Sequence, residues 1–276
     1  MVTIDIQQIL LTVGGVLFVG VALWLWFQQE KRTYEKKKRE ADKNGWTYQR
    51  FGKGLHRKYR HLPIVDGDSV RAKHVMRGQY RGRPITMFTL AFRREEPVKS
   101  RHIFDDGDRD NDGKRDTRQV KKSYGVVSVG VPTELPKFEL SAKERQGKRL
   151  RQERSRFTEQ LVGNIAGNVI GAKAGQLLFG KDYTGGKVEM GDPQFDDVFV
   201  VRSTEPDRVR ALLTPQARAW LLKSDKARKY VVWCDGQEII TWGTGTDTNV
   251  GKVKANYLND LLDQLPAGQL WGPPPS

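Results

Sequence analysis

A run of nineteen uncharged residues near the N-terminus, from Ile9 to Phe27, constrains this chain more than any other feature. Thr12 is its only polar side chain, and Trp24 and Trp26 lie at its C-terminal end. As a helix the run spans roughly 28 Å, which matches the hydrocarbon core of a bilayer, and tryptophan is enriched at membrane interfaces. No lysine or arginine precedes the run and no small-residue cleavage motif follows it. Residues 1–27 are therefore predicted to form an uncleaved transmembrane anchor instead of a signal peptide.

Basic residues follow the apolar run at once, which predicts the direction of the anchor. Those expected at the membrane surface are Lys31, Arg32, Lys36, Lys37, Lys38 and Arg39. Because lysine and arginine close to a membrane stay in the cytoplasm, we expect a single-pass cell-membrane protein with its N-terminus outside and its soluble domain cytoplasmic. Glu35 and Arg39 are spaced for an i,i+4 pair, so residues 28–44 are predicted to form a basic juxtamembrane helical stalk. The stalk either binds anionic lipid headgroups or only sets the topology.

The positive charge is concentrated near the predicted membrane. The formal net charge is +15, and residues 28–60 hold twelve lysines and arginines against four acids, hence +8. Residues 161–276 hold thirteen of each, hence 0. This distribution favours the lipid bilayer as a partner, and we expect no nucleic-acid partner.

The rest of the chain predicts one soluble α+β domain over residues 45–266, built from an antiparallel sheet and packed helices, and a mobile Pro-rich tail over 267–276. Gly45 is expected to end the stalk, and Cys234 to be a small buried hydrophobe. An alternating pattern predicts a three-stranded meander over 71–80, 85–92 and 124–131. Further strands are predicted over 195–201, 230–234 and 238–242, the last two joined by a type I′ turn at Asp235-Gly236. Helices are predicted over 205–213, 214–222 and 252–265, with Val253 facing inward.

Several short motifs resemble a group of uncharacterised single-pass membrane proteins common in actinobacteria. They are GW at 45–46, RGQYRGRPITMFTLAF at 77–92, LPKFEL at 135–140, FDDVFVV at 195–201 and DRVRALLTPQARAWLL at 207–222. The resemblance covers about residues 45–265, apart from an insert at 141–190. It implies an anchor with a compact α+β domain, and it implies no activity, cofactor or catalytic residue.

An aspartate-rich segment fits the opening of a calcium loop. Asp108, Asp110, Asp112 and Asp116 fall at the first, third, fifth and ninth positions, and Gly113 at the sixth. The twelfth position, where a bidentate glutamate belongs, is Gln119. We favour a solvated polar loop, with weak Ca²⁺ binding as the alternative.

A glycine ridge lies in the insert, which is predicted to be helical from Ser141 to Phe179 and basic in its first part. Its members, at four-residue spacing, are Gly163, Gly167, Gly171 and Gly175. Four helical glycines cost roughly 4 kcal/mol relative to alanine, so a close helix contact is expected to offset them. Three interpretations stay open: packing inside the domain, self-association or another protein contact, and an amphipathic helix on the membrane.

Catalytic motifs do not emerge from the sequence. The four histidines form no zinc pattern, and no P-loop, nucleophile elbow or strand-linked dinucleotide fingerprint is present. We therefore expect no cofactor and no catalytic residue. The sequence favours a membrane-anchored, non-catalytic binding, scaffold or assembly protein at the cytoplasmic face. The alternatives are a membrane-bound enzyme whose active site has no sequence signature and a weak Ca²⁺-binding module.

Overall fold

The computed structural model describes residues 6–60, 62, 64–65, 68–97, 117–144 and 185–266. For residues 6–16, 26, 68, 97 and 117 only the backbone is described. The aspartate-rich loop, the glycine ridge and the C-terminal tail all lie outside the described residues, so the expectations about them stay predictions.

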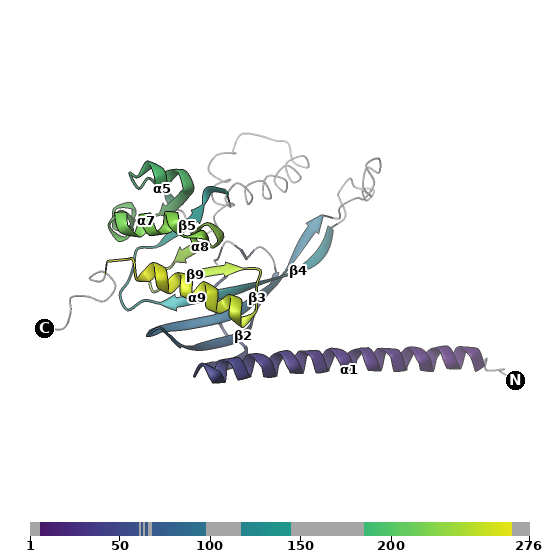
Figure 1. The fold of residues 1–276 in the computed structure, drawn as a ribbon. Coiled ribbons are helices and arrows are strands. Elements are labelled where there is room, and N and C mark those ends of the chain that lie inside the picture. The colour runs from purple at the N-terminus through teal and green to yellow at the C-terminus, as the bar shows by residue number, and fades with distance from the viewer. Residues whose placement is uncertain are drawn as a thin grey trace, which may run out of the picture.

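A nine-stranded sheet forms the centre of the protein, in the order β1-β2-β3-β4-β9-β8-β5-β7-β6 (Figure 1). All neighbouring strands of this sheet are antiparallel. The strands are β1 (Thr47–Phe51), β2 (Asp68–Tyr80), β3 (Arg83–Pro97), β4 (Thr117–Gly130), β5 (Phe138–Ala142), β6 (Gly186–Val188), β7 (Phe199–Ser203), β8 (Val232–Cys234) and β9 (Glu238–Gly243). The predicted α+β class with an antiparallel sheet is confirmed, as is the meander, which corresponds to β2, β3 and β4.

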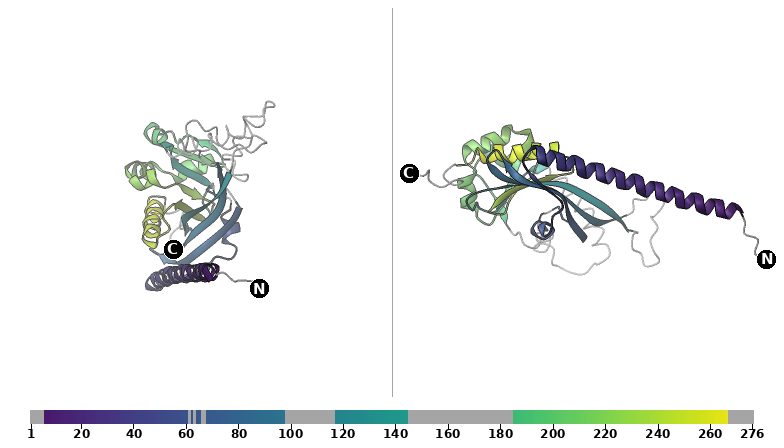
Figure 2. Two further views of the ribbon diagram at one scale, coloured as in Figure 1. Left: turned by 90° about the vertical axis from the view of Figure 1, so that its right-hand side faces the viewer. Right: turned by 90° about the horizontal axis from the view of Figure 1, so that it is seen from below.

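Helices lie on both faces of the sheet (Figure 2). One face carries α5 (Pro193–Val198), α6 (Pro206–Leu212), α7 (Pro215–Lys223), α8 (Asp225–Lys229) and α9 (Thr248–Leu262), and the other carries the short α2 (Leu55–Lys58). The larger hydrophobic core lies under α9, where Tyr257, Leu258 and Leu261 are fully buried. A smaller core joins Leu55 and Tyr59 to the opposite face of the sheet. The amphipathic pattern of α9 thus places its apolar face as expected.

The first helix, α1 (Ile6–Lys43), runs without interruption through the predicted anchor and stalk. It ends in a Schellman motif: the Trp46 amide donates to the Ala41 carbonyl at 2.9 Å, and Gly45, with φ 67°, donates to Asp42 at 3.0 Å. The helix thus ends at Lys43, two residues before Gly45, while the prediction that residues 28–44 form a juxtamembrane stalk stays a prediction. Within the described residues, no helix combines the length and the hydropathy required to cross a membrane.

Trp46 fixes the C-terminal end of α1 to the edge of the sheet. Its indole lies over Gly78 of β2, where an added Cβ would stand 2.1 Å from the ring. The indole N–H donates to the Gln79 carbonyl at 2.9 Å. Only glycine at position 78 permits this approach, so the Trp46–Gly78 contact determines where α1 leaves the domain.

Four predicted details are wrong. Residues 195–198 belong to α5 and not to a strand, because the Asp192 carboxylate accepts the Phe195 amide hydrogen and Pro193 begins the helix. Val253 is 42% exposed and not buried. Ser141 and Ala142 continue β5 instead of starting a helix. The β8–β9 hairpin is confirmed, but its turn is not type I′, because that type requires positive φ at both central residues and only Gly236, with φ 106°, has it in this turn.

Candidate functional site

A cleft of about 450 Å³ lies between α1, the sheet and the loop that joins β9 to α9. Helix α1 contributes Thr33, Lys36 and Lys37 to it. Strands β2, β3 and β4 contribute Lys73, His74, Thr89, Ala91, Lys121 and Ser123. The loop and the start of α9 contribute Thr246, Asp247 and Thr248. We call this site the cationic cleft, because four lysines and one histidine line it against a single carboxylate.

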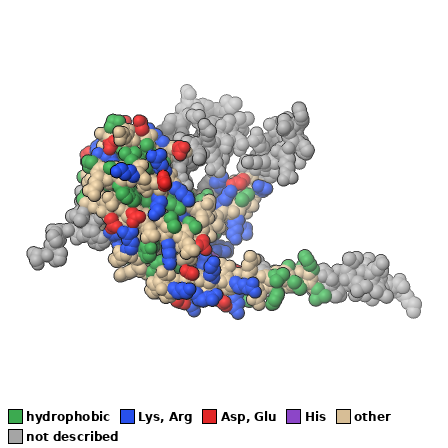
Figure 3. Space-filling view, in the orientation of Figure 1, with side chains coloured by type: hydrophobic (Ala, Val, Ile, Leu, Met, Phe, Trp, Pro, Cys, Tyr) green, Lys and Arg blue, Asp and Glu red, His purple; other side chains and the backbone are tan. Residues whose placement is uncertain are grey.

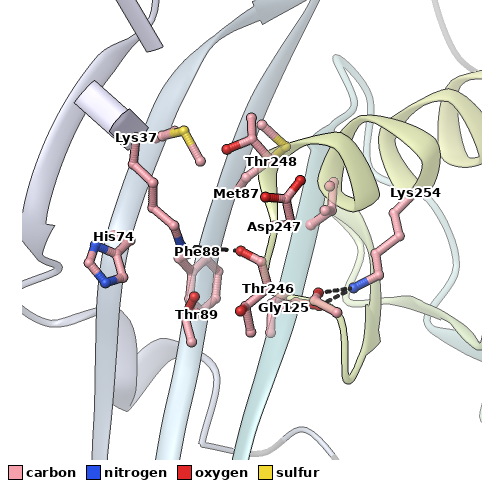
Figure 4. Close-up of a pocket in the computed structure, with 15 residues that line it drawn as sticks. Lys37, His74, Met87, Phe88, Thr89, Gly125, Thr246, Asp247, Thr248 and Lys254 are labelled. Carbon is pink, nitrogen blue, oxygen red and sulfur yellow. Dashed lines mark hydrogen bonds between the residues drawn. The ribbon is translucent and has the colours of Figure 1, made fainter. Parts of the chain in front are cut away.

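One stripe of α1 packs against the rest of the domain, and Lys37 of this stripe forms the first wall together with Thr33 and Lys36 beside it. Glu30, Tyr34, Lys37 and Ala41 follow the i, i+4, i+7, i+11 spacing of a single helix face and are its more buried positions. Tyr34 packs edge-on against Tyr48 of β1 with ring centroids 5.3 Å apart. Lys37 therefore points from α1 across the sheet, and its Nζ donates to the Thr246 carbonyl at 3.2 Å (Figure 4).

The floor of the cleft is one face of strands β3 and β4. Farther along these strands, the same face belongs to the larger hydrophobic core. On β3, alternate residues on one face change from Met87, which is buried in the larger core, to Thr89 and Ala91. On β4 the same face changes from Val127 to Ser123. Because alternate residues share a face, the two strands carry one surface from the core out into the cleft.

A β-bulge on β2 shapes the wall around His74. Lys73 pairs with Thr89 and Met76 pairs with Met87, so two residues of β2 oppose one of β3. His74 adopts φ 52°, a left-handed conformation that non-glycine residues rarely occupy. Its Nδ1 lies 2.7 Å from the Tyr48 hydroxyl. Bulges re-aim side chains and are common beside functional sites, where backbone strain also concentrates.

Burial is the main influence on the two titrating groups of the cleft whose pKa is shifted, His74 and Lys37. Burial lowers the pKa of His74 to about 4, and the charges of Lys37 and Lys73 lower it further. Burial also lowers the pKa of Lys37, while Asp247 opposes that shift. Within the described residues, no carboxylate forms an ion pair with Lys36, Lys37, Lys73 or Lys121. The cleft thus holds cations whose charge the surrounding protein does not neutralise.

An inner recess continues the cleft toward α9 (Figure 4). Its volume of about 20 Å³ is enough for one water molecule. Lys254 of α9 borders the recess, and its Nζ donates to the carbonyls of Gly125, Gly243 and Gly245 at 2.7, 3.4 and 3.0 Å. A Cβ on Gly125 would stand 2.1 Å from the Gly245 oxygen, so glycine is required where the loop crosses β4.

The structure divides the predicted basic cluster of α1 into two sets. Lys36 and Lys37 line the cationic cleft. The others lie outside it: Lys31, Arg32, Lys38 and Arg39, which are exposed, as Lys36 also is. The sequence pattern predicted that these six residues form one group at the membrane surface. Their division depends on which side of α1 faces the sheet.

The cleft residues that the sequence analysis missed come from β2 and β4. Lys73, His74 and Lys121 lie far from α1 in the sequence, and no motif links them. The one local feature of the sequence that could have indicated them is lysine in strands whose residues otherwise alternate between apolar and polar. That signal indicates an exposed strand face, and it does not indicate that α1 lies beside it.

Cys234 and the metal-binding residue types offer little chemistry in the described part of the chain. Cys234 is fully buried, which confirms its prediction as a small core residue, and burial raises the pKa of its thiol to about 12. Across the described ranges, no three histidine, cysteine or acidic side chains converge as a metal site would require.

Comparisons with known proteins leave the family open. No family model matches the chain, and no curated protein matches it. Among solved structures, the chain is similar to the crystal structure of the mycobacterial trehalose monomycolate transport factor A, TtfA. The two share 14% identity with a TM-score of 0.45, over 84% of this chain and 96% of that chain. Similarity at this level identifies neither a family nor an activity.

Proposed function

We propose that this protein is a membrane-anchored, non-catalytic binding protein, acting as a scaffold or assembly component at the cytoplasmic face of the cell membrane. In this proposal the apolar run Ile9–Phe27 spans the bilayer. The α+β domain is held close to the inner surface by the basic part of α1. We further propose that the chain belongs with the actinobacterial single-pass proteins that it resembles.

The observation that carries the proposal is the exposed apolar surface of α1. Eight large hydrophobic side chains on the part that projects from the domain are 55–76% exposed: Leu17, Phe18, Val19, Val21, Leu23, Trp24, Leu25 and Phe27. Figure 3 shows this apolar surface beyond the charged part of the helix. Burying these side chains would stabilise the protein by on the order of 10 kcal/mol. A surface of this kind requires a covering.

The distribution of these residues favours lipid over a protein groove as the covering. Consecutive helical positions are about 100° apart, so Leu17, Phe18 and Val19 already point in three different directions. A partner helix in a groove covers one stripe, whereas a bilayer covers the whole circumference. The side chains of Ile9–Val16, the other part of the proposed span, lie outside the described residues.

Membrane insertion is tested by placing charge inside the apolar run. Arginine at the centre of a span costs about 2.5–3.5 kcal/mol per residue, so Leu17→Arg/Leu23→Arg is expected to move the chain into the alkaline carbonate extract of isolated membranes. Gln29→Arg/Gln49→Arg adds the same charge outside the run and is expected to stay in the membrane pellet. If wild type is extracted by carbonate, or if both double variants stay in the pellet, the anchor proposal is wrong.

Orientation is tested by labelling with a membrane-impermeant maleimide. The buried Cys234 gives little background, so an added cysteine reports its own side of the membrane. Thr3→Cys is expected to be labelled in intact cells, and Gln49→Cys only after the cells are permeabilised. The reverse pattern would place the domain outside the cell.

A further inference from the structure

The lysines of the cationic cleft have few charged partners within the described part of the protein. Lys37 donates to one backbone carbonyl, and the Lys36, Lys73 and Lys121 side chains form no ion pair with the described residues. Ammonium groups gathered around one hollow repel each other, and Lys37 and Lys73 both disfavour protonation of His74. An anion in the cleft would remove this repulsion.

Three segments that are far apart in the sequence bring lysines to the cleft. Lysines reach the cleft from α1, from the bulged part of β2 and from the outer part of β4. All of these lysines line one hollow of about 450 Å³. That volume lies within the roughly 300–1,000 Å³ of small-molecule sites.

The donor set favours phosphate over a carboxylate ligand. A carboxylate carries one negative charge on two oxygens. A phosphate monoester carries about −1.5 to −2 and three acceptor oxygens, which suits several ammonium donors at once. Hydroxyl groups of Ser123, Thr246 and Thr248 supply neutral donors on the wall opposite α1.

We propose that the cationic cleft binds the phosphate group of an anionic ligand, which is either a membrane lipid headgroup or a soluble phosphorylated molecule. The inference rests on the proposed binding function and gives that function a ligand class. Lys36, Lys73 and Lys121 neutralise the phosphate, and Lys37 holds the loop wall in place through Thr246.

The two sources differ in how they would reach the cleft. Thr33 follows Phe27 by six residues, about 9 Å along the helix, and Lys37 follows it by ten, about 15 Å. Headgroups extend only about 5–8 Å beyond the hydrocarbon core on each side. With α1 along the bilayer normal, the headgroups stop just short of Thr33, so a lipid reaches the cleft only where α1 tilts, whereas a soluble ligand enters from the aqueous side.

The first test uses the full chain in micelles of an uncharged detergent. Inorganic phosphate and glycerol phosphate are titrated in, while NMR of ¹³C-labelled histidine follows the His74 ring. Bound phosphate is expected to shift the His74 signal and raise its pKa, because it neutralises Lys37 and Lys73. A parallel arm uses nanodiscs of phosphatidylcholine with or without phosphatidic acid, whose headgroup is a phosphate monoester.

Two variants of equal charge separate the cleft from the general surface. Lys36→Gln/Lys73→Gln/Lys121→Gln removes three cleft lysines, and binding is expected to weaken roughly tenfold or more. The control Lys31→Gln/Lys38→Gln/Arg39→Gln removes three charges outside the cleft and is expected to change binding less than twofold. Thermal melting of both variants checks that they fold.

Each outcome decides the proposal. A cleft-dependent response to free phosphate supports a soluble ligand, and one seen only with phosphatidic acid supports a lipid headgroup. No response in either arm, or equal weakening by both variants, overturns it. If carbonate extracts the wild-type chain from membranes while phosphate still shifts His74, the anchor is wrong and the cleft proposal stands.

Discussion

Two lysines approach the same inner recess from opposite sides, and they differ in burial and in the number of hydrogen bonds that they donate (Figure 4). Lys254 is 1% exposed and donates to three backbone carbonyls. Lys37 is only half-buried and donates to one. Burial lowers the pKa of both, that of Lys254 to about 8. An ammonium group has three hydrogen-bond donors. Those of Lys254 all have acceptors within the protein, whereas Lys37 and its neighbouring lysines have donors left for an outside ligand.

The largest effect is expected from Lys254→Met. The substitution removes the donor shared by the carbonyls of Gly125, Gly243 and Gly245 and is expected to lower the stability by about 2–4 kcal/mol. The measurement is the thermal midpoint of the full chain in detergent micelles. Lys37→Met, the control, is expected to lower the stability by less than about 1 kcal/mol. Equal losses in the two variants would show that Lys37 is as structural as Lys254.

The next largest effect is a loss of stability at acidic pH that is caused by His74. The pKa of His74 is about 4 in the folded chain and 6.5 in its ordinary range, so between these values the unfolded chain binds the extra proton and stability falls as pH falls. Burial is the main cause, Lys37, Lys73 and Arg50 add to it, and Glu30 opposes it. Allowing for solvent screening, the loss from pH 7 to pH 4.5 is expected to be about 1–2 kcal/mol.

His74→Asn tests this dependence, because asparagine tolerates the positive φ and does not titrate. The thermal midpoint of the variant is expected to fall less than that of wild type between pH 7 and pH 4.5. His56→Asn, which removes a histidine of α2 outside the cleft, is expected to keep the wild-type dependence. The same acid loss in all three proteins would rule out His74 as its source.

The smallest effect on stability is expected from Lys73→Gln. Lys73 has no ion-pair partner among the described residues, so its loss is expected to change the stability by no more than about 0.5 kcal/mol. The pKa of His74 is nevertheless expected to rise, because Lys73 is one of the charges that lower it. Histidine NMR titration measures this shift, with Lys53→Gln as a control on an exposed loop. An unchanged His74 pKa would mean that Lys73 does not act on the cleft.

Much of the fold follows from local patterns in the sequence. The meander and α9 were predictable because their apolar residues repeat with the periods of strands and helices over many positions. The segment at Phe195 was mispredicted because Phe195 and Phe199 fit a helix as well as a strand. There the Asp192 cap and Pro193, only two residues, decide the local structure.

The cationic cleft was not predictable in the same way. Basic residues of α1 were recognised, but their division depends on which side of the helix faces the sheet. That side is determined by the Schellman turn at Gly45 and by the close contact of Trp46 with Gly78, thirty-two positions away in the sequence. The spacing of apolar residues predicts which face of a helix or strand is buried. It does not predict how one element lies relative to another.

Because α1 runs unbroken from Ile6 to Lys43, the apolar part that we propose to span the membrane and the part that packs on the domain share one helical phase. Each residue inserted after Phe27 would lift the domain by about 1.5 Å and turn it by about 100° about the helix axis. Seven inserted residues would restore almost the original heading at roughly 10 Å greater height. In the proposed anchored arrangement, the length of α1 after Phe27 sets both the height of the domain above the bilayer and the side of the membrane-spanning part over which the domain stands.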